Sequence, residues 1–137
     1  MGTNISFKRP DGQEASGYFA PAAEAHAPGI VVIQEWWGLQ DQIRGIADRL
    51  ALAGFNALAP DLYSGIVVPY HDREAAAKAM GSLNFLDATD ESVRGAAQFL
   101  KRNGSKVGIT GFCMGGAVSV LAACRVAEFT CAAPFYG

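Results

Sequence analysis

The segment KVGITGFCMGGAV, from Lys106 to Val118, constrains the fold of this chain more than any other stretch. A short run rich in β-branched residues, Val107–Thr110, predicts a buried strand, and residues 117–126 have a helical composition. Between them a single cysteine, Cys113, lies among closely spaced glycines. A strand, a sharp turn and a helix with one nucleophile at the turn are typical of a nucleophile elbow, G-x-S-x-G, here with Cys in place of Ser.

Cys113 has two interpretations. In the functional one, the thiol lies at a helix N-terminus, whose partial positive charge favours the thiolate. The backbone N–H of Met114 then faces a developing oxyanion. In the other interpretation, Cys113 is an inert, buried cysteine in a glycine-rich turn. The preceding strand, the following helix and the second glycine, Gly116, favour the functional interpretation.

The rest of the chain predicts alternating strands and helices. The run Ile30–Ile33 is continuously apolar, which suits a strand of a parallel sheet that is covered on both faces. Further strands are expected at 5–9, 15–20, 55–59 and 129–136, and helices at 42–53, 73–80 and 87–102, with Asp41 as the cap of the first helix. This order predicts an α/β fold with a mostly parallel sheet and flanking helices, in a single domain over residues 1–137.

Composition narrows the classes of function. The net charge of -2 gives no reason to expect nucleic acid as a partner, and no apolar run is long enough to predict a membrane span. The three cysteines lack C-x-x-C spacing, so a zinc site is not expected. An odd number of cysteines suggests free thiols, which favour a reducing, cytoplasmic location.

A polar-aromatic segment, Gln34–Gly38, follows the strand Ile30–Ile33, at the end where α/β sheets bind ligands. Within it, Glu35 stands between a glutamine and two tryptophans, Trp36 and Trp37. A carboxylate in such a place is partly buried or paired, which makes it a candidate for chemistry. The alternative is a surface glutamate whose aromatic neighbours pack the core.

Four segments together resemble the dienelactone hydrolase family over essentially the whole chain. They are the elbow Gly111–Gly116 and the segments Gln34–Gly38, Ala59–Tyr63 and Lys106–Gly108. The resemblance implies an α/β-hydrolase fold and an activity near carboxymethylenebutenolidase, which opens a dienelactone to maleylacetate in aromatic degradation. It implies a small lactone or carboxylic ester as substrate, and no metal or organic cofactor.

The resemblance also implies the roles of individual residues. It assigns Cys113 as the nucleophile that forms an acyl-enzyme. It places the backbone N–H groups of Met114 and Trp36 in the oxyanion hole. It makes Glu35 the carboxylate that contacts the thiol and helps to generate the thiolate.

Two further residues are candidates for substrate binding. Arg73 matches the family's arginine that binds the substrate carboxylate, a task suited to a guanidinium. Its alternative is a solvated charge on a helix. Trp37, beside Trp36, suggests an aromatic wall of the binding pocket.

The chain departs from the family after the elbow. In α/β-hydrolases the nucleophile is followed by an acid and then a histidine, but here both histidines, His26 and His71, precede Cys113. We therefore expect the N-terminal portion of an enzyme of about 220–250 residues, with the C-terminal part missing. The alternatives are a catalytically incomplete fragment or interaction module, and a thiol-reactive protein. The apolar strand 129–136 would then lie at a sheet edge, a site for self-association.

Overall fold

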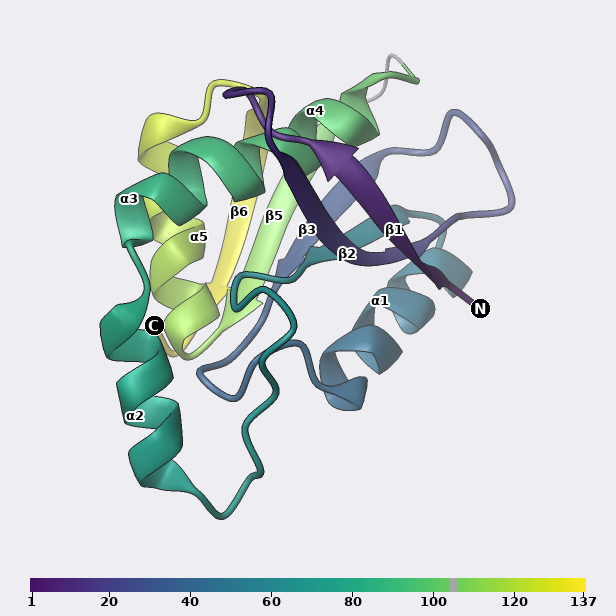
Figure 1. Cartoon of the computed structure of the whole chain (residues 1–137). Coiled ribbons are helices and arrows are strands. Elements are labelled where there is room, and N and C mark those ends of the chain that lie inside the picture. The colour runs from purple at the N-terminus through teal and green to yellow at the C-terminus, as the bar shows by residue number, and fades with distance from the viewer. Residues whose placement is uncertain (104–105) are drawn as a thin grey trace.

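The computed structural model describes residues 1–103 and 106–137 and contains one mixed sheet in these ranges (Figure 1). Its strands are β1 Thr3–Lys8, β2 Glu14–Ala20, β3 Gly29–Ile33, β4 Asn56–Pro60, β5 Val107–Phe112 and β6 Phe129–Phe135. They lie in the order β1-β2-β4-β3-β5-β6. The four strands from β4 to β6 are parallel, and β1 and β2 form the predicted antiparallel hairpin at one edge. The mostly parallel α/β sheet is thus confirmed.

Helices cover both faces of the sheet (Figure 1). They are α1 Asp41–Leu52, α2 Arg73–Ser82, α3 Phe85–Asp87, η1 Ala88–Val93, α4 Arg94–Lys101 and α5 Met114–Arg125. Helix α1 packs on one face against β2, β3 and β4, whereas α4 and α5 pack on the other. Side chains of a strand alternate between faces, so Val32 joins the core under α1 while Val31 and Ile33 join the core under α4 and α5. This explains why β3 is apolar throughout.

One prediction about the helices was wrong, and another was confirmed with a detail that the sequence did not indicate. The cap of α1 is Gln40, and Asp41 is the first residue of the helix. Oδ1 of Asp41 accepts a hydrogen bond from Nη1 of Arg44 at 3.4 Å. The helix expected at 87–102 is a continuous run of α3, η1 and α4, in which η1 is π-helical. The apolar spacing of the second half of this region predicted α4. The wider π-helical turn of η1 could not be predicted, because it does not change the spacing of apolar residues in a recognisable way.

The elbow is tighter than the sequence indicated. β5 continues to Phe112 and α5 begins at Met114, so Cys113 alone makes the turn between them. The strand was expected to end at Thr110 and the helix to begin at Ala117. The glycines on either side of Cys113 were interpreted as parts of the turn, whereas they belong to the strand and the helix.

β6 lies at the edge of the sheet, as predicted for strand 129–136. It pairs with β5 on one side, and in the described ranges no strand pairs with its other side. Residues 130–137 are exposed. The ring of Phe135 stacks on that of Phe112, with 5.3 Å between the centroids. In the part of the chain that the structure describes, no helix is both long and apolar enough to cross a membrane.

Candidate active site

The backbone of Cys113 is strained. Its φ of 56° and ψ of -119° are values that residues with a side chain rarely adopt. Two hydrogen bonds hold it there: its N–H donates to the carbonyl of Phe135 at 3.1 Å, and its carbonyl accepts from the N–H of Gly116 at 2.9 Å. The side chain is neither buried nor fully exposed. Cys113 thus makes the turn directly before the first residue of α5, with its side chain partly exposed.

Three glycines bring four elements together around this turn. A Cβ at Gly111 would collide with the carbonyl of Gly115, so β5 and α5 can approach this closely only because residue 111 has no side chain. A Cβ at Gly115 would collide with the carbonyl of Gln34, just after β3, and one at Gly116 with the carbonyl of Phe135 in β6. The glycines therefore allow α5 to lie directly against the ends of β3, β5 and β6.

Two backbone N–H groups at this end of the sheet, those of Trp36 and Met114, have no backbone acceptor among the described residues. Trp36 lies in a turn closed by the N–H of Gly38, which donates to the carbonyl of Glu35 at 3.2 Å. Met114 is the first residue of α5. Unpartnered N–H groups beside a nucleophile can stabilise an oxyanion.

Glu35 is half-buried and hydrogen-bonded, in keeping with the environment expected for it. The hydroxyl of Tyr136 donates to its Oε2 at 3.1 Å. Burial, the hydrogen bond to Glu35 and the negative charges of Glu35 and Cys113 raise the pKa of Tyr136. Tyr136 therefore lies within electrostatic reach of both Glu35 and Cys113.

Tyr63, just beyond β4, is a second tyrosine at the elbow. Its hydroxyl donates to Sδ of Met114 at 3.4 Å, and burial together with the nearby Cys113 raises the pKa of Tyr63 to about 12. The fully buried Gln34 supports this turn, because its Oε1 accepts from the N–H of Leu62 at 3.0 Å.

The sequence interpretation missed Tyr63 and Tyr136 as parts of this region. The available signal was their position: each follows a parallel strand of the sheet, at the edge where α/β proteins bind ligands. The same rule had selected Glu35 after β3.

The two tryptophans form an aromatic group with Tyr70. The rings of Trp36 and Trp37 meet edge to face at 5.4 Å, and those of Trp37 and Tyr70 at 5.5 Å. Both tryptophans are half-buried. The carbonyl of Trp37 accepts from the N–H of Val68 at 2.9 Å, which fixes the loop before α2.

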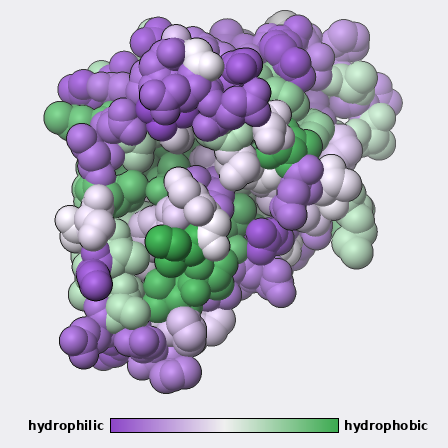
Figure 2. Space-filling model, in the orientation of Figure 1, coloured by the Kyte–Doolittle hydropathy of each residue, from purple (hydrophilic) through white to green (hydrophobic). Residues whose placement is uncertain are grey.

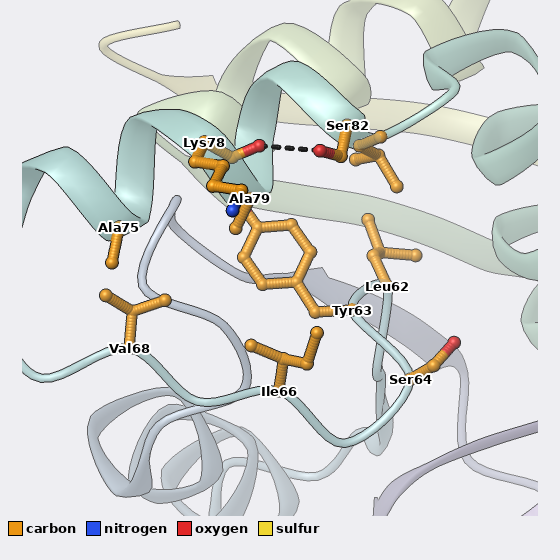
Figure 3. A pocket seen from close by; sticks show the side chains of 10 residues that line it. Leu62, Tyr63, Ser64, Ile66, Val68, Ala75, Lys78, Ala79 and Ser82 are labelled. Carbon is orange, nitrogen blue, oxygen red and sulfur yellow. Dashed lines mark hydrogen bonds between the residues drawn. The ribbon is translucent and has the colours of Figure 1, made fainter.

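An apolar hollow of about 390 Å³ lies between this loop and α2 (Figure 3). The ring of Tyr63 lies within it, so one side chain links the hollow to the elbow. Figure 2 shows a group of strongly apolar residues in the lower part of the view, and Ile66 and Val67 of this loop are exposed. The lining residues are Leu62, Tyr63, Ser64, Ile66, Val68, Ala75, Lys78, Ala79, Ser82 and Leu83.

Arg73 and Trp37 do not line this hollow. Arg73 is exposed at the first residue of α2, and it takes part in none of the ion pairs among the described residues. The cation that lines the hollow is Lys78, on the same helix. The structure thus brings Cys113, Met114 and Glu35 to one end of the sheet but leaves Arg73 on the surface.

Both histidines are exposed: His71 precedes α2, and His26 Nδ1 lies 3.2 Å from the carbonyl oxygen of Asn103. Within residues 1–103 and 106–137, no three His, Cys, Asp or Glu side chains are grouped so as to hold a metal ion.

Comparisons with known proteins agree on one family. The model of the dienelactone hydrolase family matches residues 15–137. "Protein usf" of Aquifex pyrophilus is 38% identical over 148 residues, and a "Putative carboxymethylenebutenolidase" of Aquifex aeolicus is 36% identical over 148 residues. Both matches cover 100% of this chain and 62% of the relative.

Among solved structures, a "Putative Dienelactone Hydrolase" from Klebsiella pneumoniae superposes with a TM-score of 0.83 and 28% sequence identity, covering 100% of this chain and 60% of that protein. The chain therefore spans about three fifths of the length of the proteins it matches.

Proposed function

This chain belongs to the dienelactone hydrolase family, and on that basis we propose that it carries the acylating half of a cysteine-dependent hydrolase of small lactones or carboxylic esters. The observation that carries the proposal is the strained turn at Cys113, next to two unused N–H groups. An inert structural cysteine has no need of this geometry.

In the proposed reaction, Sγ of Cys113 attacks the substrate carbonyl and forms a C–S bond. The N–H groups of Met114 and Trp36 bind the oxyanion, and Glu35 assists formation of the thiolate. The intermediate then collapses, the ester C–O bond breaks, and the alcohol leaves with a proton. In a lactone, that alcohol stays part of the bound molecule. Water next attacks the thioester, which releases the carboxylic acid and regenerates the thiol.

Substrate recognition is part of the same proposal. The apolar hollow between the loop 62–68 and α2 accepts the body of a small molecule. Trp37 does not line the hollow, but its carbonyl accepts from the N–H of Val68 in that loop, and its ring is proposed as an aromatic contact next to the hollow. Arg73 and Lys78, both on α2, are the cations proposed to attract a substrate carboxylate. No nucleic acid, membrane or cofactor enters this reaction.

The second candidate is a catalytically incomplete fragment. It is favoured by one observation, the position of both histidines before Cys113, since a histidine normally activates water for deacylation. In that case Cys113 is still acylated, but the thioester persists.

A burst experiment tests the proposal. Incubation with p-nitrophenyl acetate is expected to release about one equivalent of p-nitrophenolate per chain and to leave one acetyl group on the peptide that contains Cys113. Intact and peptide mass spectrometry measure this. Cys113→Ala is expected to abolish both signals, whereas Cys124→Ser, at an exposed position of α5, retains them.

Acetylation of Cys124 or Cys131 alone, or an unchanged burst in Cys113→Ala, would remove Cys113 from the role of nucleophile. Steady turnover after the burst favours a complete hydrolase, and a burst without turnover favours the incomplete fragment.

A further inference from the structure

Tyr136 reaches across the end of the sheet to Glu35. It directly follows β6, whereas Glu35 follows β3, and β5 with Cys113 at its end lies between these two strands. The hydroxyl of Tyr136 donates to Oε2 of Glu35 at 3.1 Å. The hydrogen bond therefore bridges the two neighbours of the strand that carries the nucleophile.

The backbone at Tyr136 is held in place by the elbow. Its φ is 35°, and among the described residues with a side chain only Ser64 and Cys113 share a positive φ. The carbonyl of Phe135 accepts from the N–H of Cys113, and Gly137 packs so closely on α5 that a Cβ there would collide with Ala117. A strained conformation that its surroundings impose is a reason to look for function.

The other tyrosines near Glu35 and Cys113 do not make the hydrogen bond that Tyr136 makes with Glu35. The charge of Cys113 contributes to the raised pKa of Tyr63 and of Tyr136, and the charges of Glu35 and Asp41 contribute to the raised pKa of Tyr70. The hydroxyl of Tyr70 donates to Gln42 instead, at 3.4 Å. Among the described residues, Tyr136 is the side chain that donates to the carboxylate of Glu35. A tyrosine hydroxyl is protonated at neutral pH, so Tyr136 is a donor there, and its raised pKa extends this state to more alkaline pH.

We infer that Tyr136 is a positioning residue for Glu35. Its hydroxyl orients the carboxylate of Glu35 and, by hydrogen bonding to it, weakens the effect of its negative charge on Cys113. The thiolate of Cys113 then forms next to a carboxylate that is already hydrogen-bonded. The inference rests on the proposed function, in which Glu35 acts on Cys113. In the free protein, before Glu35 takes up the thiol proton in the proposed reaction, its carboxylate is negatively charged. Without the hydroxyl of Tyr136 this charge is unshielded, and it opposes ionisation of the Cys113 thiol because a nearby like charge disfavours ionisation.

The test is the alkylation of Cys113 by iodoacetamide across the pH range in which a thiol ionises, with peptide mass spectrometry to separate it from Cys124 and Cys131. Tyr136→Phe removes the hydroxyl but keeps the ring, whose centroid lies 6.5 Å from that of Phe112. The midpoint of the rate–pH profile is expected to move to higher pH by about 0.5–1 unit. Near neutrality this shift corresponds to alkylation of Cys113 that is roughly 3–10 times slower.

A double variant makes the test specific. In a Glu35→Gln background, Tyr136→Phe is expected to cause no further shift, since the charge that the hydroxyl shields is gone. Tyr18→Phe is the matched control: it removes a hydroxyl that donates to Asp48 at 2.9 Å, next to α1, and leaves the profile unchanged. Tyr136 is 70% exposed, so loss of its hydroxyl does not endanger folding.

The inference is overturned by an unchanged profile in Tyr136→Phe, by an equal shift in the Glu35→Gln background, or by the same shift in Tyr18→Phe. Alkylation requires no ester hydrolysis. A protein whose Cys113 is never acetylated but whose profile shifts as expected would therefore refute the proposed function and support the role of Tyr136.

Discussion

Tyr63 is the side chain whose ionisation reports on the interior next to Cys113. Burial and the charge of Cys113 raise its pKa from 10.0 to about 12, so it is expected to ionise last among the four tyrosines. The raised pKa stabilises the fold fully below pH 10, the ordinary value in the unfolded chain. That stabilisation is lost as the pH rises towards 12, because the unfolded chain then binds fewer protons than the native one.

Ultraviolet titration of tyrosinate measures this order of ionisation. Tyr63→Phe is expected to remove the last step and to weaken the loss of stability at alkaline pH. Four phenols that titrate together near the ordinary value would contradict the burial of Tyr63 against Met114.

At the same scale, the sequence predicted some partners of the site and not others. Cys113, Met114 and Glu35 could be selected because glycine spacing and the polar-aromatic segment mark them locally. The partners Tyr63 and Tyr136 could not be paired with them, because a hydrogen bond across the sheet depends on which strands are neighbours. Nothing near Tyr136 in sequence indicates that β5 lies between β6 and β3.

Among the elements, α5 depends most on the absence of side chains. Gly115→Ala is expected to lower the stability by about 1–3 kcal/mol or more, because its Cβ meets the carbonyls of Gln34 and Ile33, which are backbone and cannot move aside. Gly45→Ala in α1 is the matched control. There the nearest atom to a Cβ is Arg49 Nη1 at 4.0 Å, so alanine is expected to raise the stability by about 0.5–1 kcal/mol.

Urea denaturation of both variants measures the two changes. A Gly115→Ala protein as stable as the parent would show that α5 does not need its close approach to β3.

The order of elements along the chain was predictable, whereas two local details were not. Apolar periodicity predicted α1 and α4, acidic residues near its start indicated α2, and continuous apolar runs predicted β3 and β5. The π-helical turn of η1 has hydrogen bonds that span one residue more than those of an α-helix, but it has no distinctive composition, so the sequence contained no signal for it. The ends of the elbow were misplaced because glycine marks both turns and close packing.

At the scale of the whole sheet, β6 has a side that no strand of the described residues pairs with, and this edge is the most consequential surface. Exposed, unpaired strands recruit other strands, so we expect the apparent mass of the chain to rise with concentration. Ala133→Lys places a charge on β6 and is expected to reduce this association. Leu52→Lys changes another exposed apolar residue, at the end of α1, and it is expected to leave association unchanged.

Sedimentation velocity over a range of concentrations measures the association. A chain that stays monomeric at every concentration, or an equal effect of both lysine variants, would rule out β6 as the site of self-association.

The three-layer α/β architecture followed from alternating strands and helices, but the strand order did not. β4 lies between β2 and β3 although β3 precedes it in the chain, and this placement depends on contacts between distant segments. Two such contacts are the pairs Tyr18–Ala59 and Ile30–Ala57, which no local pattern reveals.

The dependence of the elbow on Phe135 has a consequence for synthesis on the ribosome. Cys113 leaves the exit tunnel before Phe135, whose carbonyl anchors its strained backbone. At about 5–20 residues per second, the nascent chain carries an elbow without its anchor for a time on the order of seconds. During that interval the turn can relax. The strained conformation of Cys113 therefore forms only after β6 has emerged and paired with β5.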